Sequence, residues 1–120
     1  MARVSWTVRL KTISGANARE HHFSRARRVR EERSIVRGGW LRLGKPALPS
    51  PPVLVTITRI SPRKLDSDNL ASALKGARDE VAALLGIDDA PDRGAVWRVD
   101  QRKPPAPKTH LIEVLIEALT

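Results

Sequence analysis

Hydrophobic and polar residues alternate along several stretches of the chain, with the period of two that is typical of half-buried strands. Residues 4 to 13 alternate in this way, and so do residues 95 to 102, AVWRVDQR. Residues 53 to 60, VLVTITRI, are short and β-branched at most positions, which predicts a central strand. In the last stretch, HLIEVLIEAL, Glu113 and Glu117 are four apart, as on a helix, but Ile112, Val114 and Ile116 alternate. Its β-branched content favours a strand.

Two further stretches predict helices. Arg19 to Arg37 contains neither proline nor glycine, and we expect Gly38-Gly39 to end that helix. From Asn69 to Leu85, apolar residues recur at helical spacing, and Gly86 follows. The order β-α-β-α-β-β predicts an α+β fold in which two helices pack on one mixed sheet. We expect residues 1 to 120 to form a single domain.

Composition narrows the possible classes of protein. The chain has no cysteine, which excludes a disulfide framework and a thiolate metal site. It contains no apolar run long enough for a signal peptide or a membrane span, so we expect a cytoplasmic protein with no membrane partner. With 120 residues it is long enough for one core, and association with a second copy is a reasonable expectation.

Positive charge is concentrated in the N-terminal part of the chain. Residues 1 to 45 hold twelve Lys and Arg against three Glu, a balance equal to the net charge of +9 of the whole chain. On the predicted helix, four arginines spaced three or four apart share one face: Arg27, Arg30, Arg33 and Arg37. Such a field attracts polyanions, and nucleic acid is the commonest one in the cytoplasm. The alternative explanation is that the arginine-rich surface serves only the solubility of the protein.

Acidic residues gather in one segment, KLDSDNLASALKGARDEVAALLGIDDAPD, residues 64 to 92, which holds seven of the thirteen. Carboxylates two residues apart after a strand, such as Asp66 and Asp68, can converge on one Mg²⁺, although aspartate is also a favoured helix N-cap. Asp88-Asp89 can likewise be metal ligands or a polar turn. An EF-hand calcium loop is excluded, because Leu70 stands where an oxygen ligand is needed.

These residues carry a resemblance to a known family. RKLDSDNLASALKGARDEVAALLGIDDA is similar to the central motif of the RusA-type Holliday junction resolvases, in which Asp-x-Asp-Asn-Leu opens a helix and Asp-Asp follows it. The resemblance implies a homodimeric, Mg²⁺-dependent endonuclease that resolves four-way DNA junctions by paired nicks in recombination and repair, often encoded on prophages. It also implies that Asp66, Asp68 and Asp89 bind the metal, with Asp88 beside them.

One position departs from the family pattern. The family has a functional lysine one helical turn after its second aspartate, where this chain has Ser72, and the nearest lysine is Lys75. Lys75 either takes that role or is an ordinary surface residue. Arg63 and Lys64, in the preceding loop, are further candidates for neutralising charge and binding DNA.

The predicted helix also separates the two acidic clusters. About 17 residues at roughly 1.5 Å each place its ends about 25 Å apart, so Asp89 does not reach Asp68 in one chain unless the chain folds back. In a two-fold dimer with antiparallel helices, each site would combine Asp66 and Asp68 of one chain with Asp89 of the other. The alternative function is a non-catalytic DNA-binding protein, a phage regulator or architectural protein, in which the acids are caps and turns.

Overall fold

The computed structural model describes residues 2–13, 22–87 and 93–119. Its elements, in chain order, are β1 (Arg3–Arg9), α1 (His22–Arg42), β2 (Val53–Ile60), α2 (Ser67–Ala73), α3 (Lys75–Leu85), β3 (Ala95–Arg102) and β4 (Leu111–Ala118). The predicted α+β class and the predicted order of strands and helices are confirmed, except that the second predicted helix is divided into α2 and α3. The ambiguous last segment is a strand.

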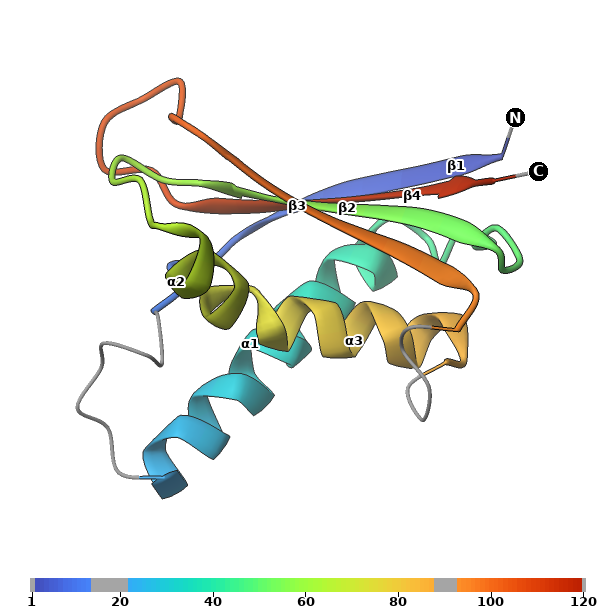
Figure 1. Cartoon of the computed structure of the whole chain (residues 1–120), viewed down its shortest axis with the longest axis horizontal. Coiled ribbons are helices and arrows are strands. Elements are labelled where there is room, and N and C mark those ends of the chain that lie inside the picture. The colour runs from blue at the N-terminus through green and yellow to red at the C-terminus, as the bar shows by residue number, and fades with distance from the viewer. Residues whose placement is uncertain (1, 14–21, 88–92, 120) are drawn as a thin grey trace.

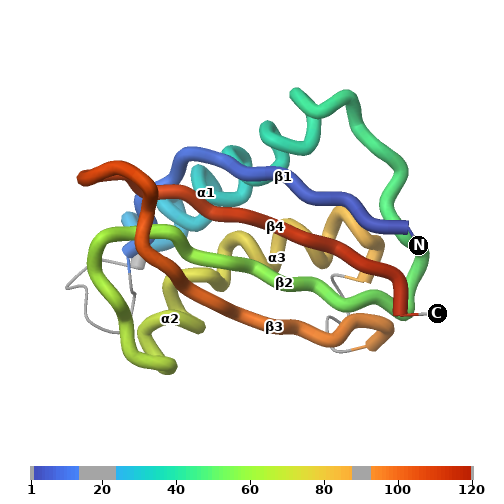
Figure 2. Tube along the Cα trace, turned by 90° about the horizontal axis from the view of Figure 1, so that it is seen from above, coloured from blue at the N-terminus to red at the C-terminus, as the bar shows by residue number. Residues whose placement is uncertain are grey.

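The strands form one mixed sheet in the order β1-β4-β2-β3 (Figure 2). β4 runs antiparallel to β1 and β2, whereas β2 and β3 are parallel and are connected through α2 and α3. β2 lies between β4 and β3, which confirms the prediction of a central strand. The last row of the sheet is Arg9, Leu111, Ile60 and Arg102, and α2 follows this row in the chain. We call this the Asp66 end of the sheet.

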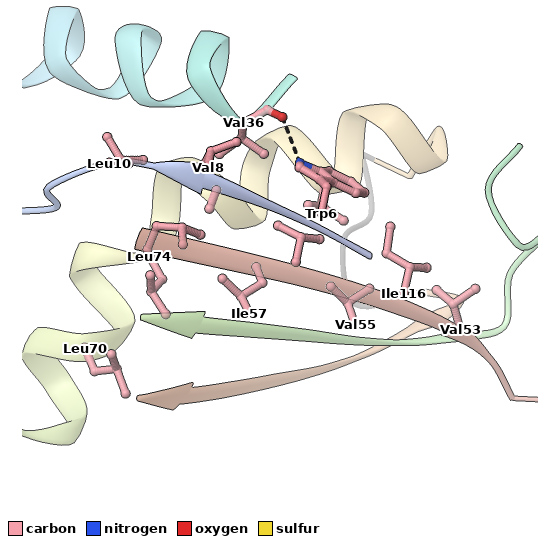
Figure 3. Close-up of a cluster of buried hydrophobic side chains, with 14 residues drawn as sticks. Trp6, Val8, Leu10, Val36, Val53, Val55, Ile57, Leu70, Leu74 and Ile116 are labelled. Carbon is pink, nitrogen blue, oxygen red and sulfur yellow. Dashed lines mark hydrogen bonds between the residues drawn. The ribbon is translucent and has the colours of Figure 1, made fainter. Parts of the chain in front are cut away.

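All the helices of the described residues lie on one face of the sheet, and the core lies between the two layers (Figure 1). Alternate residues of the strands point into it, including Val53, Val55 and Ile57 of β2, which are almost fully buried. Figure 3 shows them in one cluster with Leu70 and Leu74 of the helices, which lie toward Ile57 and away from Val53. Trp6 is buried, as its strand position predicts, and its indole Nε1 donates to the carbonyl of Val36 in α1 at 2.9 Å.

Gly38-Gly39 does not end the first helix, so this part of the prediction is wrong. α1 continues to Arg42, and Gly44 with φ 93° follows in the turn. A Cβ on Gly39 would lie 2.7 Å from Trp6 Cδ1 and would also overlap Val8. Glycine is therefore required at position 39 because the helix approaches β1 closely, and its effect on helix propensity is outweighed by packing.

The second predicted helix is interrupted at Leu74, which has φ −97° and ψ 3°. Its backbone hydrogen bonds continue across the interruption, from Leu74 N to Leu70 O at 3.1 Å and from Arg78 N to Leu74 O at 2.9 Å. The buried residues keep helical spacing through the kink, which explains why the sequence pattern predicts one helix. α3 then crosses α1 at Gly76, where a Cβ would lie 2.9 Å from Glu32 Oε1.

The other face of the sheet carries no helix within the residues that the structure describes (Figure 1). Leu54 and Leu115 are half-buried there, and Val96 on the edge strand β3 is 55% exposed. In the described ranges, no helix is long and apolar enough to cross a membrane.

Candidate functional site

Asp66 and Asp68 lie at the beginning of α2, and both are exposed. Asp66 is the N-cap: its Oδ1 accepts from Asn69 N at 2.9 Å, and its Oδ2 accepts from Asn69 Nδ2 at 3.0 Å. Asp68 is in the first turn, where a negative charge also stabilises the helix. The capping interpretation of Asp66 is thus confirmed. Capping does not exclude metal binding, because each carboxylate oxygen keeps a second lone pair.

Gln101 of β3 fixes the loop that leads to Asp66. Its Oε1 accepts from Leu65 N at 3.0 Å, and its Nε2 donates to Leu65 O at 2.7 Å. The side-chain amide therefore holds both backbone groups of the residue directly before the N-cap. The sequence contains only a weak signal for this contact, namely a polar residue at an inward position of an alternating strand.

Arg59 supports the same loop from the core side. It lies in β2, is 6% exposed, and donates from Nη1 to Arg63 O at 2.5 Å and from Nε to Thr12 Oγ1 at 3.2 Å. Burial lowers the pKa of its guanidinium from the ordinary value. Sequence analysis missed this residue, although an arginine within a run of buried β-branched residues is the signal that points to it.

Asp88 and Asp89 lie outside the described residues. The nearest described residues on either side are Ile87 and Arg93, and Gly94 O accepts from Val53 N at 2.8 Å, at the start of β2. Asp66 follows the other end of that strand. Because β2 advances about 3.3 Å per residue, the two ends are roughly 23 Å apart.

Lys75 begins α3, one residue beyond the kink. Its Nζ contacts Asp79 Oδ2 at 2.8 Å, an ion pair within one turn of the helix. Within the described part of the chain, its ammonium forms no ion pair with Asp66 or Asp68. Ser72, at the position of the family lysine, is half-buried in α2.

The four arginines of the predicted basic face fall into two pairs. Arg33 Nε lies 2.9 Å from Glu80 Oε1, and Arg37 Nε lies 2.5 Å from Glu80 Oε2, so both guanidiniums bind one buried carboxylate of α3. Arg27 and Arg30 are exposed and form no ion pair with any described residue. The sequence pattern correctly groups these side chains, but it does not show that two of them connect the helices.

The described residues contain no group of three or more His, Cys, Asp or Glu side chains that could hold a metal ion. The possible donors near the start of α2 are the carboxylates of Asp66 and Asp68. That number fits Mg²⁺, which usually takes one or two protein carboxylates and completes its coordination with water and substrate phosphate.

Comparison of the chain with protein-family models gives no match, and comparison with curated proteins gives none either.

Proposed function

We propose that this protein is a Mg²⁺-dependent endonuclease of the RusA type that cuts four-way DNA junctions as a homodimer. The observation that carries the proposal is the position of the Asp66-Ser67-Asp68-Asn69 motif. It follows a central strand, begins a helix, and presents two exposed carboxylates beside the exposed cations Arg63 and Lys64. This placement agrees with the resemblance between the sequence and the resolvase motif.

Asp66 and Asp68 are the described residues that would hold the metal. Mg²⁺ would supply charge for the scissile phosphate and lower the pKa of a bound water. The chain's own residues prepare the site: Asn69 holds the carboxylate of Asp66 by two hydrogen bonds, and Gln101 holds the preceding backbone. A carboxylate whose rotamer is fixed in advance loses less entropy when it binds a cation.

The cations near the carboxylates act on the substrate. Arg63 and Lys64 precede Asp66 in the same loop and bind phosphate oxygens, which offsets the repulsion between DNA and the acidic residues. Lys75 contributes only if its ammonium leaves Asp79. Such an exposed pair within a helix is worth about 0.3–0.5 kcal/mol, so its separation costs little.

The active form is a dimer with shared sites. Gly94 lies at the end of the sheet opposite Asp66, and Asp88 and Asp89 stand between α3 and Gly94 in the chain, which favours a partner chain as their source. The open face of the sheet is available for association: Leu54, Leu115 and the exposed Val96 lie on it among polar and charged side chains of the same strands.

A nicking assay on a synthetic four-way junction tests the proposal directly. We expect paired nicks with Mg²⁺, none with chelator, and little cutting of a linear duplex of the same sequence. If the junction stays intact with Mg²⁺ as it does with chelator, at protein concentrations that saturate the DNA, the protein is not this nuclease.

The second candidate is a DNA-binding protein without catalytic activity. The observation that favours it is the cap: Asp66 already has a structural role, which accounts for an aspartate at this position without any metal. Such a protein would bind the junction equally well with Mg²⁺ or chelator and would leave every strand intact.

A further inference from the structure

Two basic hollows lie next to one another at the Asp66 end of the sheet. One, of about 210 Å³, is lined by Ser61, Pro62, Lys64, Gln101, Arg102 and Lys103. The other, of about 310 Å³, is lined by Arg9, Leu10, Lys11, Lys108, Thr109 and His110. Their residues come from the ends of β1, β2 and β3 and from the segment before β4, so the sequence does not show that they form one surface.

Ser61 and His110 join the two hollows. Ser61 Oγ lies 3.0 Å from His110 Nδ1, and Ser61 N donates to Arg102 O at 3.2 Å. On the other side, Leu10 N donates to His110 O at 3.1 Å. The hydrogen bonds hold the two hollows side by side across the end of the sheet.

The cations of this surface are available for a ligand. Five cations that line the hollows are exposed and form no ion pair with any residue in the described ranges: Arg9, Lys11, Lys64, Lys103 and Lys108. The same holds for Arg63, which stands between Pro62 and Lys64 in the chain. Arg102 is bound to Glu113 at 3.2 Å. On α1, by comparison, Glu80 already neutralises part of the charge of Arg33 and Arg37.

We infer that one DNA strand crosses the Asp66 end of the sheet through both hollows, with its phosphates bound by the lysines and arginines named above. This inference rests on the proposed function, because it assumes that DNA is the ligand. We call this surface the basic track. Its Lys64 side is in the loop that leads to Asp66, so a strand on the track passes beside the two carboxylates.

The dimensions and chemistry of the basic track suit a nucleic acid backbone. From β1 to β3 there are three strand spacings of about 4.8 Å, or roughly 14 Å. At roughly 3.4 Å of helix axis for each phosphate of one duplex strand, this length accommodates at most about four phosphates. None of the residues that line the two hollows is an exposed large apolar side chain, whereas a protein interface or a membrane anchor needs apolar contacts.

The test compares pairs of substitutions that remove equal charge at different places. Lys64→Gln/Lys103→Gln and Lys11→Gln/Lys108→Gln each remove two cations from the basic track. Arg3→Gln/Arg93→Gln removes two exposed cations that form no ion pair with any described residue. Both lie near the opposite end of the sheet, where Arg3 is opposite Glu117 in the β1–β4 register and Arg93 precedes Gly94. Affinity for a labelled four-way junction is measured with chelator over a series of salt concentrations, and thermal melting confirms folding. The same variants are tested for binding to anionic lipid vesicles.

Each variant of the basic track should reduce the slope of log affinity against log salt by up to about 1.8, or about 0.9 per lost phosphate contact, while the control changes it far less. If the control reduces the slope equally, the overall positive charge of the protein accounts for DNA binding and the inference is wrong. It is also wrong if the variants lose vesicle binding and keep DNA binding.

The same experiment separates this inference from the proposed nuclease. If wild-type protein binds the junction but does not nick it with Mg²⁺, the nuclease proposal fails, and the salt slopes still decide the basic track. If wild-type protein does not bind DNA at all, both proposals fail.

Discussion

At the scale of single residues, Asp66 and Asp68 differ in what holds them. Asn69 occupies one lone pair on each carboxylate oxygen of Asp66, and this contact caps α2. Asp68 forms no ion pair or side-chain hydrogen bond with any described residue. Its charge therefore contributes to stability mainly through the helix dipole, which is worth about 0.3–1 kcal/mol. Asp68 is thus the better position at which to separate metal binding from folding.

Replacement of Asp68 by Asn should lower Mg²⁺-dependent nicking by orders of magnitude, because the amide keeps the shape and loses the charge that binds Mg²⁺. Junction binding and the melting temperature should stay close to wild type. The matched control is Asp100→Asn, which changes another exposed aspartate, on β3. If the Asp68 variant cuts as fast as the control, Asp68 is not a metal ligand.

At the scale of elements, the sequence predicts the strands better than the helices. The buried face of β2 can be read from the sequence, because successive side chains of a strand point to opposite faces. From Val53 through Val55 to Ile57, every second residue is accordingly buried. Gly39 led to the wrong prediction of a helix end, because glycine ends many helices. In the folded chain it lies instead within α1, at a close contact with β1 that the sequence does not show. The contacts of Gln101 and Arg59 with the Asp66 loop are hidden for the same reason.

Alanine substitutions at the two adjacent glycines of α1 should change the free energy of unfolding in opposite directions. Gly39→Ala should lower the free energy of unfolding by about 1–3 kcal/mol, because its Cβ overlaps Trp6 and Val8. Gly38→Ala, whose Cβ would meet only the end of Arg42 at 3.4 Å, should raise it by up to about 1 kcal/mol through helix propensity. Urea denaturation measures both. Similar effects of the two substitutions would contradict the close approach of α1 to β1.

The arginine pairs of α1 should separate DNA binding from stability. Arg27→Gln/Arg30→Gln should reduce the salt slope of junction binding by up to about 0.9 per lost phosphate contact and leave the urea midpoint unchanged. Arg33→Gln/Arg37→Gln leaves the buried carboxylate of Glu80 without its two cations, which should cost about 1–3 kcal/mol of stability. If the first pair lowers stability or the second leaves it unchanged, the division between the pairs is wrong.

At the scale of the whole molecule, the sheet separates the two ends of the connection between β2 and β3. Asp66 follows β2 at one end, and Gly94 precedes β3 at the other. A parallel pair requires this arrangement, because the connecting helices carry the chain back along the sheet. The kink at Leu74 does not reverse the path, since α3 continues away from α2 (Figure 1). Helix length predicts that Asp89 is far from Asp68 in one chain, and the parallel register gives a physical reason to expect this, although Asp89 itself lies outside the described residues.

Mixing two inactive chains tests whether the proposed sites are shared. An Asp68→Asn homodimer and an Asp89→Asn homodimer should both fail to nick, because each has two damaged sites. With shared sites, the heterodimer has one site with both substitutions and one with neither, so it should nick one strand of the junction. With sites built within one chain, each chain of the heterodimer brings its own damaged site and no nicking is expected.

The chains are tagged differently and exchanged by unfolding and refolding together. Nicking by the purified heterodimer, at about half the wild-type rate per dimer, supports the shared site. Wild-type protein carried through the same refolding is the positive control. If it nicks and the confirmed heterodimer does not, the shared site is contradicted.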